Sequence, residues 1–134
     1  MPNSVHPRVT NDGPRNSVID VTGVLDDGDL ELQTLVDKDG LYAEPGYKVT
    51  KLRIDTIDRS VDPGIIVELL WEDKDGYHAH ATSFHGVGTM NAERMGGKHN
   101  DAMKPTGNIL IRTRGYTKGR NTFSFSIELV KQFT

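Results

Sequence analysis

Histidine is the residue type in this sequence best suited to hold a metal ion, and two of the five histidines stand close together. His78 and His80 are two residues apart on an expected strand, so their imidazoles would share a face and could reach one ion. His85 and His99 could approach from a long glycine-rich segment. No spacing fixes a third ligand, so we interpret the pair as surface histidines and expect no metal.

Aspartate and glycine recur together at 26–29, 37–40 and 73–76, a composition shared with calcium loops. An EF-hand loop needs three spaced oxygen ligands before its glycine and a glutamate six residues after it. With Gly76 as the anchor, Trp71 falls on the first ligand position and Thr82 on the last, so the pattern fails. We interpret these segments as turns.

Catalytic motifs are weak throughout the sequence. Ser83 and His85 share a face of an expected strand, but nothing marks a third member of a triad. Gly86-Val87-Gly88 supplies half of a dinucleotide fingerprint and opens no helix. The sequence has no cysteine, which excludes disulfides, thiolate metal sites and cysteine nucleophiles. We therefore expect a protein that is not an enzyme and has no cofactor.

Charge is unevenly placed along a chain whose net charge is −3. Residues 17–47 carry eight acids and one base, whereas residues 94–134 carry eight bases and two acids. An anionic chain suits a polyanion poorly, so we expect acid–base pairing within the chain or between copies rather than nucleic acid binding. The best basic patch with an aromatic residue consists of Arg112, Arg114, Tyr116, Lys118 and Arg120.

These side chains are positioned by short strands that follow one another from Ser17 onward. Residues 65–71 are apolar on both faces, which is typical of a central strand. In 122–130 the apolar residues alternate with polar ones, and Asp75-Gly76 is a hairpin signal. The nearest approach to a helix is one turn near 89–94. The sequence predicts an all-β fold of about seven strands, an antiparallel β-sandwich for which a jelly-roll-like arrangement is one option.

Two segments depart from this succession of short strands and turns: an extended N-terminal arm and one long loop. Residues 1–16 contain three of the six prolines and little apolar content, so we separate this arm from a single sandwich domain at 17–134. The arm is either a disordered leader or a tether that becomes ordered on a partner. His85–Gly107 contains five glycines and three of the four methionines. Long loops are usually functional, and methionine adapts to irregular surfaces, so we expect this segment to bind a partner. The partner-binding residues expected from both segments are Val5, Pro7, Val9, Met90, Arg94, Met95 and Met103.

The second half of the chain has an ordered series of short motifs. It begins with a strand ending in Leu70-Trp71 and continues with Gly86-Val87-Gly88, Gly96-Gly97, Thr106-Gly107-Asn108-Ile109, Thr113-Arg114-Gly115 and a β-rich terminus that ends at Lys131. In this order and spacing, residues 61–131 resemble small structural proteins of tailed-bacteriophage virions, which decorate or cement the capsid. The resemblance implies a β-sandwich, the major capsid protein as partner, and no catalysis or cofactor. It assigns no individual binding residue.

Two classes of function follow from these observations. The first is a non-enzymatic virion component, made in the host cytoplasm and placed on the capsid surface, which binds the shell through the arm and the long loop as a homo-oligomer, a dimer or trimer. The second is a β-sandwich module that binds a ligand or a host surface. A head–tail connector or tail protein is a further alternative. For the second class the stacking platforms would be Tyr42, Tyr47, Trp71, Tyr77 and Tyr116, although we expect Trp71 in the core. No apolar run approaches the ~20 residues of a membrane helix, and no secretory signal is visible at the N-terminus.

Overall fold

The computed structural model describes residues 3–92 and 96–133. Within these residues the chain forms nine strands and one short 3-10 turn. The strands are β1 (Ser4–Asp12), β2 (Asn16–Leu25), β3 (Gln33–Val36), β4 (Val49–Val61), β5 (Ile66–Asp73), β6 (Ala79–Phe84), β7 (Val87–Asn91), β8 (Pro105–Arg114) and β9 (Asn121–Phe133), and the turn is η1 (Lys38–Gly40). No helix in this part of the chain is long and apolar enough to cross a membrane.

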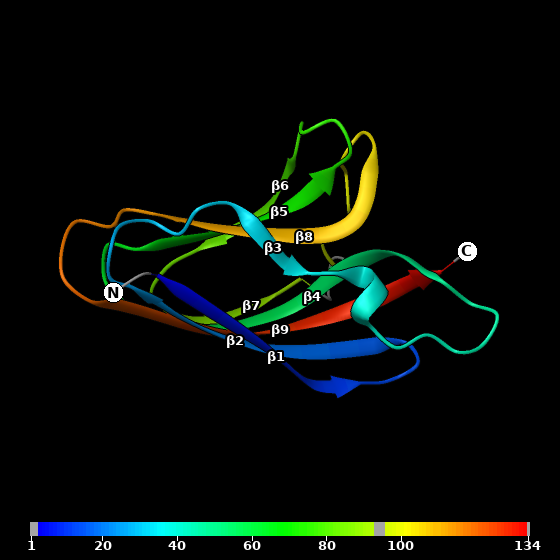
Figure 1. Ribbon diagram of the computed structural model, residues 1–134. Helices are drawn as coiled ribbons and strands as arrows, with labels where there is room; N and C mark the ends of the chain where they lie inside the picture. The colour runs from blue at the N-terminus through cyan, green and yellow to red at the C-terminus, as the bar shows by residue number, and fades with distance from the viewer. Residues whose placement is uncertain (1–2, 93–95, 134) are drawn as a thin grey trace.

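The strands form two antiparallel sheets that face each other (Figure 1). The five-stranded sheet has the order β1-β2-β9-β4-β7, and the four-stranded sheet has the order β3-β8-β5-β6. The pairs β2·β9, β3·β8, β4·β7 and β5·β6 are nested, as they would be in one long hairpin with its tip between β5 and β6. Rolling such a hairpin produces a jelly roll, so the predicted β-sandwich is confirmed and its topology is that of a jelly roll.

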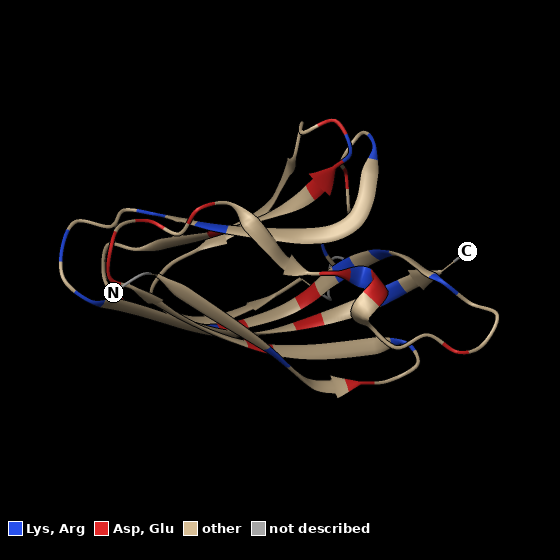
Figure 2. Cartoon of the chain, viewed as in Figure 1, with Lys and Arg blue, Asp and Glu red and all other residues tan. Residues whose placement is uncertain are grey.

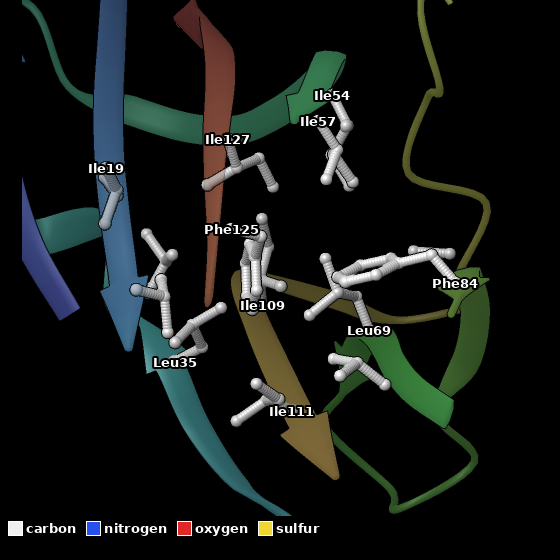
Figure 3. Close-up of a cluster of buried hydrophobic side chains, with 14 of the residues drawn as sticks. Ile19, Leu35, Ile54, Ile57, Leu69, Phe84, Ile109, Ile111, Phe125 and Ile127 are labelled. Atoms are coloured by element: carbon white, nitrogen blue, oxygen red, sulfur yellow. The ribbon is translucent and has the colours of Figure 1, made fainter. Parts of the chain in front are cut away.

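The core lies between the two sheets and follows the period-2 pattern of the strands. Phe125 and Ile127 of β9 point toward Ile109 of β8 and Leu69 of β5 (Figure 3). Ile127, Ile109 and Leu69 are fully buried, and Phe125 is 4% exposed. Trp71 is 1% exposed, which confirms that it packs in the core rather than serving as a ligand platform.

The N-terminal segment differs from the expectation of an arm apart from the sandwich. Residues Ser4–Asp12 are extended, but they form the edge strand β1 and pair with β2 along most of their length. β1 contributes few apolar side chains to the core, which explains why the hydrophobic pattern did not reveal it. The backbone hydrogen bonds of a pairing strand do not depend on side-chain type, and composition therefore cannot exclude them.

The long segment His85–Gly107 also contains more regular structure than expected. Its first part forms β7, the other edge of the five-stranded sheet, and Lys98 makes an isolated bridge to Ile54 of β4. β8 begins at Pro105, so the loop is shorter than the sequence pattern indicated. Thr89 lies within β7 and not in a helical turn; the 3-10 turn stands elsewhere, at Lys38–Gly40.

Alternating strand directions gather every second connection at the same end of the sandwich. The β1–β2, β3–β4, β5–β6 and β7–β8 connections lie at one end together with the end of β9, as the pairs Asn16↔Val130, Val49↔Phe133 and Asp73↔Pro105 indicate. We call this the Phe133 end; in Figure 1 the β1–β2 and β3–β4 connections lie on the right, near the label C, and the β5–β6 connection stands at the top of the picture. The β2–β3, β4–β5, β6–β7 and β8–β9 connections lie at the opposite end.

Candidate functional site

The predicted contact residues of the N-terminal segment share one face of β1. Val5, Pro7 and Val9 are alternate residues, and Pro7 pairs with the buried Val21 of β2. Val5 is half-buried against the core, whereas Pro7 is exposed and Val9 is 48% exposed. The structure therefore places all three side chains in one strip, whose exposed part is Pro7 and Val9. We refer to Pro7 and Val9 as the β1 strip.

The predicted contact residues of the long segment are not brought together. Met90 lies in β7, packs against the core and accepts a hydrogen bond at its sulfur from the Thr82 hydroxyl (3.6 Å). Met103 is 89% exposed. Arg94 and Met95 lie outside the described residues. Of the methionines proposed to dock on a partner, Met103 is the one that the structure places on the surface.

Met103 stands beside the tip of the β5–β6 hairpin, and the backbone there is fixed. The Lys104 backbone N–H donates to the Asp73 carboxylate (2.8 Å), and the Lys104 ammonium pairs with Asp75 (2.8 Å). Tyr77, 80% exposed, follows the same tip. We call Tyr77 and Met103 the hairpin-tip pair. Among the described residues, these two side chains are the most exposed large apolar groups at the Phe133 end, and hydrogen bonds hold the chain segments that carry them.

The Asp73 carboxylate organises this tip by accepting backbone hydrogen bonds. The N–H groups of Lys104 and Asp75 donate to it (both 2.8 Å) and lower its pKa, an effect that outweighs the opposing effect of desolvation. The tip therefore depends on an ionised Asp73.

A second group of exposed rings lies at the Phe133 end, around an open cleft of about 390 Å³. Tyr47 and Phe133 meet edge to face with ring centroids 6.0 Å apart, and they are 60% and 37% exposed. The cleft is lined by Pro14, Arg15, Glu44, Tyr47, Lys131 and Phe133. Its walls come from three separate parts of the chain: the β1–β2 turn, the η1–β4 loop and the end of β9.

A buried lysine ties these walls together. The Lys131 side chain is fully buried, and its ammonium donates to the Asp12 carboxylate, the Gly13 carbonyl and the Tyr42 carbonyl, each at 2.6 Å. The ammonium thus joins the β1–β2 turn and the η1–β4 loop to β9 with three charge-assisted bonds. The cleft is pre-formed by these contacts.

Asp12 completes the cluster from the other side. Burial opposes its ionisation, but hydrogen bonds from the Lys131 ammonium, the Tyr42 N–H and the Ser17 hydroxyl outweigh burial and lower the pKa of Asp12 below its usual value. An ionised Asp12 therefore neutralises the buried ammonium.

Sequence reasoning missed this cluster, although one signal was present. Phe123, Phe125, Ile127 and Leu129 alternate toward the core, and Lys131 continues the same alternation. A lysine at the next inward position indicates a buried charge that needs partners.

Three of the four basic residues considered for nucleic acid binding, Arg112, Arg114 and Arg120, are paired with acids inside the chain. Glu68, whose side chain is 5% exposed, lies within 3.4 Å of Arg112 and 2.6 Å of Arg114, and the Arg120 guanidinium lies 3.5 Å from Asp26. Figure 2 shows acidic and basic residues interspersed along the strands and loops. The pair Arg120–Asp26 is an expected link between residues 94–134 and the acidic residues 17–47, whereas Lys131 pairs with Asp12, which precedes that acidic segment.

Of the two histidines expected on one strand, His80 lies within β6 and His78 does not. His78 precedes β6, and its Nδ1 accepts a hydrogen bond from the Asp73 N–H (3.0 Å), while His80 is exposed within β6. The pairing of β5 with β6 has an irregularity between Leu69 and Leu70, beside His80. Across the described residues, no three histidine, aspartate or glutamate side chains are grouped so that they could hold a metal ion.

Comparisons with known proteins give only weak structural likenesses to solved chains. No family model and no curated protein matches the chain. The crystal structure of Peruvianin-I, a cysteine peptidase from Thevetia peruviana latex, is similar at a TM-score of 0.38 and 10% sequence identity. The likeness covers 92% of this chain and 60% of that one, so the chain spans less than two thirds of the peptidase chain. A likeness of this degree carries no argument about function.

Proposed function

We propose that this protein is a non-enzymatic structural component of a tailed-phage virion, a cement or decoration protein that binds and stabilises the capsid shell. The proposal rests on the sequence resemblance over residues 61–131 and on one structural observation. That observation is the hairpin-tip pair: Met103, 89% exposed, and Tyr77, 80% exposed, on a backbone fixed by Asp73 and Lys104. A jelly roll hosts many functions, so the fold alone does not carry the proposal.

The hairpin-tip pair is suited to gripping a preassembled surface. Buried apolar area contributes about 25 cal/mol per Å², and methionine adapts its shape to an irregular partner. The segments that carry the two side chains are already ordered, so binding costs little additional backbone entropy. Many copies on one shell would add weak contacts through multivalency.

The β1 strip provides a second apolar contact on a different part of the surface. Pro7 and Val9 lie on an edge strand, and Val9 is 48% exposed. Pro7 has no N–H, which makes the free edge of β1 a poor template for another strand. We therefore assign attachment here to side chains rather than to added sheet pairing. The partner in this proposal is the major capsid protein, and the copies assemble as a symmetric dimer or trimer.

Particle composition is the first test of this proposal. Virions of the phage that encodes the chain are purified and examined by quantitative mass spectrometry. We expect the chain at many copies per particle. Its absence would refute the virion assignment, and a copy number near that of the portal or tail proteins would favour the connector or tail alternative.

A matched set of variants tests the assigned contact. Met103→Asp and Tyr77→Asp place a charge on the hairpin-tip pair, while Val87→Asp places the same charge on a side chain that is 81% exposed at the opposite end. Each variant is sedimented with shells that lack the protein. We expect at least about tenfold weaker binding for the tip variants, since a carboxylate desolvated without a partner costs more than the 1.4 kcal/mol of a tenfold change. Equal binding by all three variants would refute the contact.

A further inference from the structure

We propose that the cleft between Tyr47 and Phe133 binds a neutral saccharide. This inference does not rest on the capsid proposal. The cleft is lined by the β1–β2 turn, the η1–β4 loop and the end of β9. No residue of the hairpin-tip pair or of the β1 strip lines it. Its volume of about 390 Å³ lies within the range of small-ligand sites.

The aromatic side of the cleft presents ring surface that the fold leaves open. Tyr47 is 60% exposed, although its ring already contacts Phe133 at a centroid distance of 6.0 Å. The two planes are inclined by 70°, so the rings form a corner rather than a flat patch. The apolar C–H face of a pyranose ring stacks on such an aromatic surface, whose π-cloud is negative at its face.

The rim of the cleft carries the polar groups that hydroxyl recognition requires. Arg15 and Glu44 line the cleft, and both are exposed. Among the residues that the structure describes, neither side chain has a hydrogen bond or ion pair, so both are available to a ligand. A guanidinium offers five N–H donors and a carboxylate accepts from two hydroxyl groups. The opposite charges of these two groups cancel, which favours a neutral ligand over an anionic one.

The buried Lys131 cluster makes this cleft a pre-formed site. Its ammonium holds the Gly13 and Tyr42 carbonyls at 2.6 Å and thereby fixes the loops that carry Arg15, Glu44 and Tyr47. A ligand that enters a pre-formed cleft pays little for ordering it. The apolar corner, the donor and acceptor at the rim and the fixed walls together match a ligand with one apolar face and an edge of hydroxyl groups, which is the chemistry of a neutral sugar.

The test begins with an array of neutral glycans probed with the full chain, followed by saturation-transfer NMR on the best binder. Tyr47→Ala and Phe133→Ala remove the two rings. Leu32→Ala is the matched control, because Leu32 is 41% exposed, close to the 37% of Phe133, and lies away from the cleft. We expect Tyr47→Ala to weaken binding at least about tenfold and Leu32→Ala to leave it unchanged. Glu44→Gln, which keeps the shape of the side chain, should weaken binding less than the loss of either ring.

Two outcomes would overturn the inference. One is that no neutral glycan binds above the level of unrelated proteins; the other is that a bound glycan is unaffected by both ring variants. Near-ultraviolet circular dichroism of the buried Trp71 confirms that each variant is folded. The Tyr47→Ala variant is also sedimented with shells. Retained shell binding alongside lost glycan binding separates the saccharide site from the capsid contact, so each proposal can fail without the other.

Discussion

Replacing Lys131 with methionine should destabilise the protein more than any single surface substitution. Methionine fills much of the same space, so the change removes the charge and the donors while leaving little cavity. The wild-type ammonium makes three bonds of 2.6 Å in a fully buried position. Without it, the Asp12 carboxylate loses its counter-ion and two carbonyl groups lose a donor.

The size of the expected loss in stability depends on which interactions remain after the substitution of Lys131. Removing one partner of a buried ion pair costs 3–5 kcal/mol in other proteins. Asp12 is 25% exposed and keeps its bonds from Ser17 and the Tyr42 N–H, which reduces the cost of leaving it charged. The Gly13 and Tyr42 carbonyls lose bonds that contribute on the order of 1 kcal/mol each. We therefore expect a loss of about 3 kcal/mol in the free energy of unfolding.

Urea denaturation followed by the fluorescence of the buried Trp71 measures this loss. The midpoint should fall with little change in slope. Lys104→Met is the matched control: it removes the same charge from an ion pair whose side chains are 65% and 50% exposed, and exposed pairs contribute below about 1 kcal/mol. If Lys131→Met costs no more than Lys104→Met, the reasoning about the buried cluster is refuted.

The same prediction has a pH signature with a definite sign. The folded-state pKa of Asp12 lies below the usual value of 3.8, so the native state favours the ionised carboxylate. Its stabilising contribution is present above about pH 4 and is lost as the pH falls through the folded-state pKa. The difference in stability between wild type and Lys131→Met should therefore be largest near neutral pH and should decrease below pH 4. A difference that does not change with pH would contradict the assigned role of Asp12.

Three further predictions test the fold and the hairpin tip. Trp71→Ala should cost about 3–5 kcal/mol by urea denaturation, because it empties a core site that is 1% exposed; a cost below 1 kcal/mol would contradict its core placement. Gly115→Ala should be more destabilising than Gly119→Ala: both have positive φ, but a Cβ at 115 would lie 2.1 Å from the Gly64 carbonyl oxygen and one at 119 meets nothing within 4 Å, so equal melting temperatures would contradict this contact. In NMR titrations the backbone amide of Lys104 should shift with a midpoint below 3.8, because its hydrogen bond helps lower the pKa of Asp73; a midpoint at or above 3.8 would show that the bond is not formed in solution.

Strands with strong alternation could be predicted because one face of each is buried in the core. The inward positions of β9 from Phe123 to Leu129 are all at most 4% exposed, as period-2 reasoning requires. The apolar run 65–71 became β5, which pairs with β6 on one side and β8 on the other. In these segments the apolar positions in the sequence are the positions whose side chains are buried in the core.

Edge strands could not be predicted in the same way, because they are held mainly by backbone hydrogen bonds. β1 and β7 form opposite edges of the five-stranded sheet, and their side chains are mostly exposed or half-buried. Register irregularities are a second limit, since one extra residue moves the following side chains to the other face. One such irregularity lies between Leu69 and Leu70 of β5, where β6 has an extra residue between His80 and Thr82.

The candidate cleft could not be predicted because its residues meet only through long-range pairing. Arg15, Glu44 and Phe133 come from segments far apart in sequence, and they converge because Asn16 pairs with Val130 and Val49 pairs with Phe133. Loops that leave a sheet have no ladder of hydrogen bonds to fix them, so an open aromatic site on such loops requires another anchor. The buried Lys131 ammonium provides it by occupying carbonyl groups that would otherwise need water. A fully buried charge therefore lies directly behind the cleft that we assign to a ligand, and the stability of this cluster and the geometry of the cleft depend on the same three bonds.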